Sequence, residues 1–207
     1  MKLNAFWLKI IALIAMTVDH YGYFIEPSVD IYRIIGRLAF VIFAYFVANA
    51  YIHTSNRMKH GLILLGFGLA IDVILIATNN YVFSNIFITL SLGYFLIYSY
   101  DKKKYLISIL LVALTFFLNI DYGVYGVLLI SVCYIFFNNP LKIALINITL
   151  IFICGMFESM SVLQLYSTFG ILLLYLYNNE RGYKVKYLFY IYYPLHIIVL
   201  SYLSNYL

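Results

Sequence analysis

Hydrophobic and polar positions alternate along this chain in long blocks. Nine predominantly apolar runs are separated by short polar segments. A helix needs about 20 residues, within a range of ~17–25, to cross the hydrocarbon core of a bilayer. The pattern therefore predicts an all-α fold, a polytopic transmembrane bundle of about nine spans, with eight or ten as the alternatives. The expected spans are Phe6–Phe24, Ile31–Tyr51, Gly61–Thr78, Val82–Tyr100, Lys103–Ile120, Tyr122–Phe137, Leu141–Phe157, Val162–Tyr177 and Tyr187–Leu203.

The composition excludes whole classes of protein. Of the 207 residues, 65% are hydrophobic and only 10% are charged, whereas a soluble domain averages about 25% charged residues. So few charges cannot cover a surface that faces water, which excludes a soluble enzyme. Disorder is excluded too, because disordered chains are polar and poor in aromatic residues. We expect one integral membrane domain over residues 1–207.

The basic residues predict an orientation in the membrane. All but two of the 13 Lys and Arg residues lie in the N-terminal segment or in alternate polar segments, the exceptions being Arg33 and Arg37. The positive-inside rule then places the N-terminus in the cytoplasm and the C-terminus outside. Because these residues serve to orient the chain, no nucleic acid is expected as a partner. They are Lys2, Lys9, Arg57, Lys59, Lys102, Lys103, Lys104, Lys142, Arg181, Lys184 and Lys186.

The first apolar run is similar to the core of a signal peptide, but no small-residue cleavage site follows it. We expect an uncleaved first span in a multi-pass protein of a bacterial cell (inner) membrane. Cys133 and Cys154 lie within apolar runs, and their spacing matches neither a metal site nor a redox motif. No metal is expected.

Several ionisable residues fall at membrane depth, where each charge costs at least ~2.5 kcal/mol. The first two spans are joined by a short turn, which places Asp19 and Arg37 at similar depth and allows an ion pair. Asp72 in the third run offers a second carboxylate to Arg37 or Arg33. Pairing between helices and a reaction centre both explain these residues.

Two histidines stand out within apolar runs. Successive helical residues point about 100° apart, so Asp19 cannot face His20, and a partner on another helix must set the tautomer of that histidine. A catalytic His20 would be a general base. His196 follows Tyr193 and Pro194, and we expect a kink there that forms a polar pocket wall. Packing without catalysis is the alternative for both histidines.

Two further pairs have both a structural and a functional interpretation. His53 and Arg57 follow the second span, where they are either solvated or bound to the phosphates of a cytoplasmic donor. Asn85 and Thr89 are four residues apart and share a helix face, either for packing or as part of a pocket.

In order and spacing, these landmarks resemble the TraX family of membrane acetylases of conjugative pilin, over nearly the whole chain. Departures are Val41, where the family often has proline, and Asn49, where an acidic residue is common. Asp72 lies in a stretch that varies in the family. The similar stretches are Lys9–Gly22, Arg33–Phe40, Tyr51–Thr54, Asn85–Gly93, Asp121–Leu129, Leu176–Gly182 and Lys186–His196.

The resemblance implies transfer of an acetyl group from acetyl-CoA to the N-terminal amine of a pilin. A secreted peptide amine and a surface glycan hydroxyl are equally reasonable acceptors, and no metal is expected in the reaction. His20 would act as the base or carry the acetyl group transiently, and Arg37 would stabilise an oxyanion or secure Asp19. The implied catalytic set is His20, Asp19, Arg37 and His196. The implied acetyl-CoA contacts are His53, Arg57, Arg181, Lys184 and Lys186. The implied pocket is lined by Asp72, Asn85, Thr89 and Tyr193.

The competing prediction is a non-enzymatic membrane protein, either a permease or an immunity or assembly partner for a secreted peptide. Many transporters are built from inverted repeats with matched broken helices. No internal repeat is obvious here, which weakens the permease. A binding partner would not need histidine and arginine residues at membrane depth.

Overall fold

The computed structural model describes residues 2–78, 85–157, 161–183 and 188–206. Within these ranges the regular structure is helical, apart from isolated bridge residues, which include the parallel bridge between Leu3 and Tyr177. The all-α prediction is confirmed, and each expected span contains helical structure. The helices are α1 (Ala5–Phe24), α2 (Asp30–His53), α3 (Arg57–Ala77), α4 (Ile86–Asp101), α5 (Tyr105–Phe117), α6 (Gly123–Ile135), α7 (Pro140–Gly155), η1 (Val162–Tyr166), α8 (Ser167–Leu173), η2 (Leu174–Leu176) and α9 (Leu188–Ser204).

Asparagine side chains begin four of the helices. Asn4, Asn56, Asn85 and Asn139 each accept a hydrogen bond from a backbone N–H in the first turn of α1, α3, α4 and α7. Helix α4 therefore begins at Ile86, four residues after the start of the expected span.

The fifth and sixth spans are shorter than expected. Lys103 and Tyr122 have positive φ angles of 57° and 62°, a conformation that does not continue an α-helix. These residues separate α5 from α4 and from α6. The eighth expected span is not one continuous α-helix but the succession of η1, α8 and η2.

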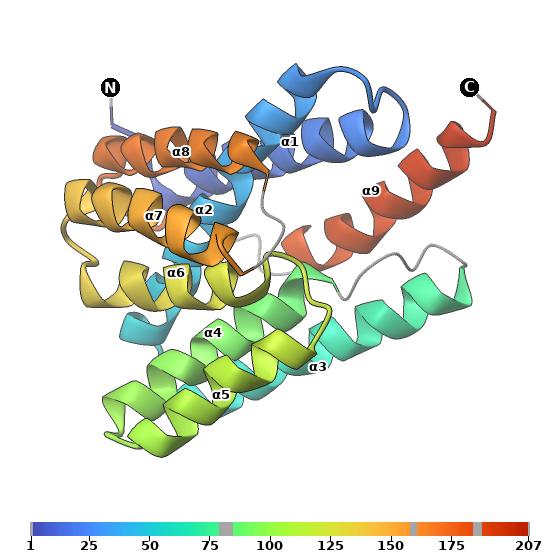
Figure 1. Cartoon of the computed structure of the whole chain (residues 1–207). Coiled ribbons are helices and arrows are strands. Elements are labelled where there is room, and N and C mark those ends of the chain that lie inside the picture. Colours follow the sequence, from blue (N-terminus) through green and yellow to red (C-terminus); the bar gives the residue numbers. More distant parts are fainter. Residues whose placement is uncertain (1, 79–84, 158–160, 184–187, 207) are drawn as a thin grey trace. The chain divides into compact units, whose positions relative to one another are not determined.

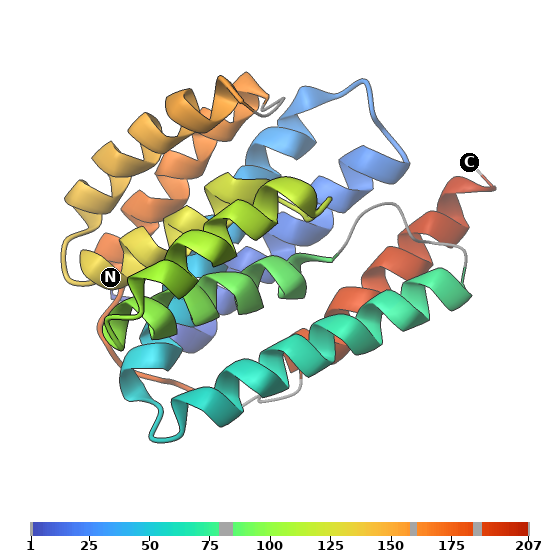
Figure 2. The same ribbon diagram turned by 60° about the horizontal axis from the view of Figure 1, so that its bottom comes forward.

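The chain divides into two compact units, which are described separately (Figures 1 and 2). Unit 1 comprises Met1–Phe43 and Ser161–Leu207, and unit 2 comprises Ala44–Met160. Helix α2 begins in unit 1 and ends in unit 2. The expectation of a single domain over residues 1–207 stays a prediction.

In unit 1, the short segment of residues 25–29 joins α1 to the first half of α2, and α1 also packs against α9. The segment before α1 is bound to the segment after η2. Leu3 N–H donates to the Leu176 carbonyl at 2.6 Å, and Asn178 N–H donates to the Leu3 carbonyl at 2.9 Å. These two segments thus lie at the same end of unit 1, in agreement with the alternation of basic segments in the sequence.

Glycines allow the helices of unit 1 to approach closely. A Cβ at Gly36 on α2 would overlap the carboxylate of Asp19 on α1. A Cβ at Gly170 on α8 would lie 2.8 Å from the carbonyl oxygen of Leu38 on α2. The absence of a side chain at Gly36 is therefore what lets Asp19 reach the α2 backbone.

We predict that Gly36→Ala lowers the thermal unfolding midpoint of the detergent-purified protein, measured by circular dichroism. The new methyl group must displace the Asp19 side chain, and overpacking of this kind typically costs about 1–3 kcal/mol. Gly66→Ala is the matched control, because a Cβ at Gly66 meets nothing within 4 Å and alanine favours a helix. Equal midpoints for the two variants would contradict the close contact.

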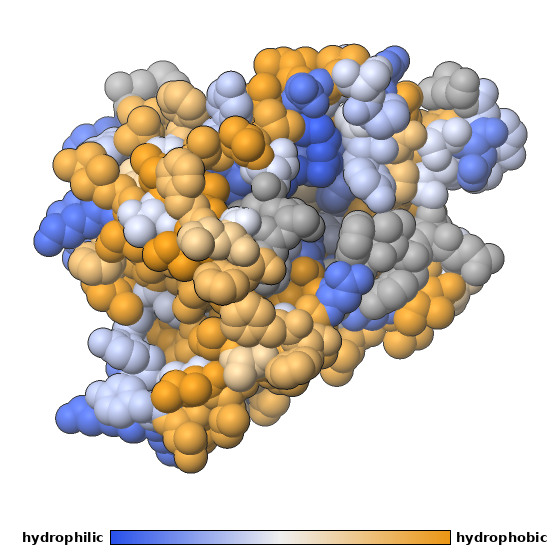
Figure 3. Space-filling view, in the orientation of Figure 1, coloured by the Kyte–Doolittle hydropathy of each residue, from blue (hydrophilic) through white to orange (hydrophobic). Residues whose placement is uncertain are grey.

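In unit 2, α4 packs against α3, α5 and α6, and α7 packs against α6. Helix α5 buries a polar side chain and exposes large apolar ones. Thr115 is 2% exposed, whereas Leu106 is 70% and Phe117 is 86% exposed. The surface around α5 is largely hydrophobic in Figure 3. Such a distribution is unfavourable in water, because large apolar side chains gain by leaving it.

Among the described residues, α2 and α3 are long and apolar enough to cross a membrane. The apolar helices from α4 onward have 17 residues or fewer. The nine-span topology and the cytoplasmic N-terminus stay predictions.

Candidate functional site

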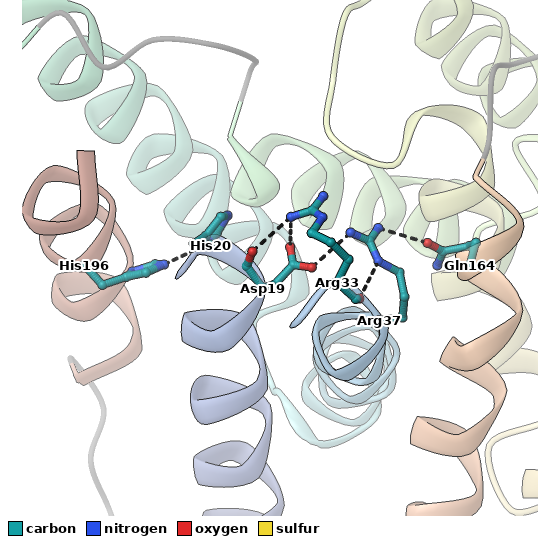
Figure 4. Close-up of polar contacts among 6 residues, drawn as sticks. All are labelled: Asp19, His20, Arg33, Arg37, Gln164 and His196. Carbon is teal, nitrogen blue, oxygen red and sulfur yellow. Dashed lines mark hydrogen bonds and ion pairs between the residues drawn. The ribbon is translucent and has the colours of Figure 1, made fainter. Parts of the chain in front are cut away.

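Unit 1 holds a row of six polar side chains that come from four elements of the fold (Figure 4). Helix α1 provides two of them, α2 provides two, and η1 and α9 provide one each. The row runs from α9 across α1 and α2 to η1. Its members are Asp19, His20, Arg33, Arg37, Gln164 and His196.

Asp19 is the centre of a charged cluster between α1 and α2. Arg33 Nη1 donates to Asp19 Oδ2 at 2.8 Å, and Arg37 Nη2 donates to Oδ1 at 3.0 Å. The two arginines are four residues apart, which places them on the same face of α2. The predicted pair of Asp19 and Arg37 is confirmed, and Arg33 binds the same carboxylate.

The charged cluster has more positive than negative charge. Within the described residues, these ion pairs set two guanidinium groups against one carboxylate that is only 8% exposed. Arg37 also donates from Nη1 to Gln164 Oε1 at 3.2 Å. Gln164 is 3% exposed and orients the guanidinium without neutralising it. A surplus positive charge in a poorly hydrated site favours an anion or a developing oxyanion.

His20 and His196 form a hydrogen-bonded pair between α1 and α9. His20 Nδ1 lies 2.7 Å from His196 Nε2, and the ring centroids are 4.9 Å apart. The expectation that a residue of another helix contacts His20 is confirmed. His196 is 6% exposed, while His20 is partly exposed. Tyr193, a predicted pocket residue, packs edge-on against both imidazoles, with centroid distances of 6.4 and 5.6 Å.

The side chains of the adjacent residues Asp19 and His20 point toward different helices. Asp19 points toward α2 and His20 points toward α9. In this arrangement His196, and not Asp19, orients the His20 ring. Pro194 lies inside α9, which runs from Leu188 to Ser204, and the expected kink stays a prediction.

Three of the predicted pocket residues lie in unit 2, where they join helices. Asp72 Oδ1 accepts from the Asn85 backbone N–H at 3.2 Å and from Asn85 Nδ2 at 2.7 Å. Asn85 Nδ2 also donates to the Gly68 carbonyl at 2.7 Å. Thr89 donates to the Asp121 carbonyl at 2.5 Å. These contacts give Asp72, Asn85 and Thr89 a structural role between α3, α4 and the turn before α6.

The residues predicted to hold acetyl-CoA belong to both units, and two of them lie outside the described residues. His53 Nδ1 donates to the Asn49 carbonyl at 3.0 Å on the surface of unit 2. Arg57 binds Asp101 at 2.8 Å in the same unit. Arg181 is exposed and belongs to unit 1. Lys184 and Lys186 lie outside the described residues.

Asp101, the last residue of α4, is the centre of a second polar cluster. Its Oδ2 accepts from the Tyr51 hydroxyl at 2.9 Å and from Arg57, and its Oδ1 accepts from the Tyr134 hydroxyl at 3.2 Å. The Arg57 guanidinium also lies 4.5 Å from the centroid of the Tyr51 ring. The ends of α2, α4 and α6 and the start of α3 therefore meet at one end of unit 2, as the alternation of basic segments predicts.

We predict that Asp101→Asn destabilises unit 2 by about 1–2 kcal/mol, because it weakens three hydrogen bonds and leaves Arg57 without its carboxylate. The buried thiols of Cys133 and Cys154 provide the measurement, since a thiol-reactive dye labels them as this unit unfolds. Lys102→Gln, an exposed neighbour, is the control for the loss of one charge. Identical unfolding of both variants would contradict the role of Asp101.

Comparison with known proteins bears on this geometry. The sequence matches the TraX protein family over residues 5–204. The chain belongs to the TraX family. It is 28% identical over 232 residues to the probable fimbrial assembly protein FimC, serogroup H1, of Dichelobacter nodosus, an alignment that covers 95% of this chain and 94% of that protein. It is 35% identical over 97 residues to the uncharacterized protein RP591 of Rickettsia prowazekii, with 46% of this chain but only 37% of that protein aligned. No solved structure matches.

Within this TraX-family chain, the sequence analysis did not propose as site residues two members of the row, Arg33 and Gln164, and one residue that contacts it, Tyr192. Arg33 had a usable signal, namely its spacing of four residues from Arg37. Gln164, the only glutamine in the sequence, lies in an apolar run, where an amide needs a partner. Tyr192, whose carbonyl accepts a hydrogen bond from His196 Nδ1 at 2.9 Å, had no signal that set it apart from the neighbouring tyrosines.

Proposed function

We propose that this TraX-family protein is a membrane acetyltransferase. It moves acetyl from cytoplasmic acetyl-CoA to an acceptor at the membrane or its outer face, either a pilin or secreted peptide amine or a glycan hydroxyl. One observation carries the proposal. Partly exposed His20, held by buried His196, lies in the same unit as two arginines that share a single carboxylate. A base and a surplus positive charge are the two features that acyl transfer requires.

The proposal places the chain in a bacterial cell membrane as a multi-pass protein of about nine spans, with a cytoplasmic N-terminus. Support comes from α2 and α3, which are long and apolar enough to cross, and from α5, whose large apolar side chains are exposed while Thr115 is buried. Lipid is the solvent in which such a surface is favourable. The polar ends that meet at Asp101 are the ends that the charge pattern assigns to the cytoplasm.

In the proposed reaction, His20 removes a proton from the acceptor amine or hydroxyl as that group attacks the thioester carbonyl carbon. A C–N or C–O bond forms and the C–S bond breaks. The proton then passes from His20 to the departing thiolate, which leaves as free CoA. The surplus charge of Arg33 and Arg37 favours the oxyanion of the tetrahedral intermediate. A transient acetyl group on His20 is the competing route, and mass spectrometry of the acid-quenched protein distinguishes the two.

The donor must be held by its phosphates, because acetyl-CoA is charged and cannot cross lipid. Basic residues at the proposed cytoplasmic ends are suited to that task. Among them, Arg57 is held in place by Asp101, which leaves it a fixed donor near the surface. The set that we propose for the donor is His53, Arg57, Arg181, Lys184 and Lys186.

The test uses the full-length protein in proteoliposomes with radiolabelled acetyl-CoA and membrane and secreted fractions of the host. Label on a peptide N-terminus or a glycan hydroxyl, together with stoichiometric release of free CoA thiol, is the expected result. It also identifies the acceptor class. Protein that binds acetyl-CoA yet labels nothing in any fraction would contradict the acetyltransferase.

An assembly role without catalysis is the second candidate, which the name of the Dichelobacter relative favours. Such a protein would act through its surface and would not need the proton chemistry of His20. Restoration of surface-fibre assembly by a His20→Ala variant in a strain that lacks this gene would favour the assembly role. Failure of the same variant would favour catalysis.

A further inference from the structure

The donor and the acceptor in the hydrogen bond between the two histidines can be deduced from the neighbouring group that contacts His196. His196 Nδ1 lies 2.9 Å from the backbone carbonyl oxygen of Tyr192, which can only accept, so Nδ1 carries the proton. In a neutral imidazole the other nitrogen is then an acceptor. His196 Nε2 therefore accepts from His20 Nδ1 over 2.7 Å. The nitrogen of His20 that keeps its lone pair is Nε2.

Tyr192, which sets this direction, is held in place on two sides. The Thr17 hydroxyl donates to the Leu13 carbonyl at 2.8 Å, so at the 2.7 Å contact the Tyr192 hydroxyl is the donor to Thr17. The Tyr192 ring also stacks on the His196 imidazole, with an interplanar angle of 11° and a centroid distance of 5.2 Å. The first contact joins α1 to α9 and the second lies within α9. Together they fix the side chain of the residue whose backbone carbonyl accepts from His196.

Burial separates the roles of the two histidines. His196 is 6% exposed, whereas His20 is partly exposed and is therefore the more accessible of the two rings. Among the described residues, the contacts of His196 are with groups of α1 and α9, which suits a residue that holds and supports its neighbour.

We propose that His196 is a positioning residue that makes His20 Nε2 the proton-accepting atom of the site. This inference rests on the proposed acetyl transfer. When Nε2 takes the proton of the acceptor, the proton on His20 Nδ1 is shared with His196 Nε2, and the pair carries one positive charge. The pair returns to neutrality when His20 Nε2 gives a proton to the departing thiolate. Spreading the positive charge over both imidazoles matters because the positively charged Arg33 and Arg37 lie on the other side of α1. Their repulsion opposes a positive charge confined to His20.

Two substitutions at His196 test the positioning role. Glutamine has a side-chain oxygen that accepts from His20 Nδ1, whereas leucine has a similar size and no acceptor. We expect His196→Leu to lower kcat/KM for acetyl transfer about a hundredfold and His196→Gln only about tenfold. Equal losses in the two variants, or transfer by His196→Leu within twofold of the wild type, would overturn the inference.

Nitrogen-15 NMR of histidine-labelled wild-type protein gives a readout that does not depend on activity, and the His20→Ala variant serves only to assign the resonances. The expected signature is a protonated Nδ1 and an unprotonated Nε2 on His20. An active wild type whose His20 carries its proton on Nε2 overturns this inference and leaves the acetyltransferase standing. A wild type with the expected tautomer but no acetyl transfer overturns the proposed function and, with it, the relay.

Discussion

Replacing His20 with alanine is expected to reduce acetyl transfer by about 10²–10⁴-fold, the usual contribution of a general base. The variant loses the Nε2 atom that accepts the proton of the acceptor, while Asp19, Arg33 and Arg37 keep their ion pairs on the other side of α1. The rate of CoA release with a defined acceptor, at saturating acetyl-CoA, is the measurement. Because the imidazole is on the reaction path, the loss should appear in kcat and not only in KM.

His60→Gln is the matched control for His20→Ala. His60 belongs to unit 2 and has no place in the proposed chemistry. Both variants should insert into membranes and elute as a single species in detergent, and His60→Gln should transfer acetyl at the wild-type rate. Full transfer by a well-folded His20→Ala variant would remove His20 from the mechanism.

Replacing Asp19 with asparagine is expected to have the second-largest effect, on stability as well as on transfer. The substitution keeps the shape of the side chain but leaves Arg33 and Arg37 facing each other in a site where their former partner is 8% exposed. Removal of one member of a buried ion pair costs about 3–5 kcal/mol, because the remaining charge is left uncompensated. Circular dichroism in detergent should show a lower unfolding midpoint.

The double variant Asp19→Asn with Arg33→Met separates charge balance from loss of contacts. It restores the wild-type surplus of one positive charge in the cluster, so it should recover part of the lost midpoint without recovering transfer. Arg33→Met alone is the control, because it leaves Asp19 bound to Arg37. A double variant that is less stable than Asp19→Asn would contradict the uncompensated charge as the cause.

The sequence was informative where the physics is local. Long apolar runs predict helices because the backbone hydrogen bonds of each turn are made within the run. The helices of the structure lie where these runs lie. The ends were less predictable. A positive φ at Lys103 and at Tyr122 shortens α5 and α6, and the eighth run is divided into three short helices. These boundaries depend on turns whose signals are weak in so apolar a sequence.

The site, too, was predictable in part from the sequence. The short connection between the first two spans was enough to predict the pair of Asp19 and Arg37, because hairpin neighbours meet at equal depth. The same reasoning offered Asp72 as a second carboxylate to Arg33 or Arg37, and that pairing stays a prediction. What the structure adds is that Asp72 accepts two hydrogen bonds from Asn85. The arginine of the donor set, Arg57, is held by Asp101, a residue that the sequence analysis did not single out. In both cases the observed partner comes from another helix, and local spacing in the sequence does not identify it.

By itself, the amino-acid sequence determined that this protein is helical, apolar and a member of a family recognisable from spaced motifs, and that ionisable residues stand where charges are costly. Only the tertiary structure decided which of these residues meet. His20 and His196 are separated by 176 positions, and Arg37 and Gln164 by 127. The physical reason is that helix formation is encoded within each run, whereas the pairing of side chains across helices depends on how those helices pack, down to the absence of a single Cβ at Gly36.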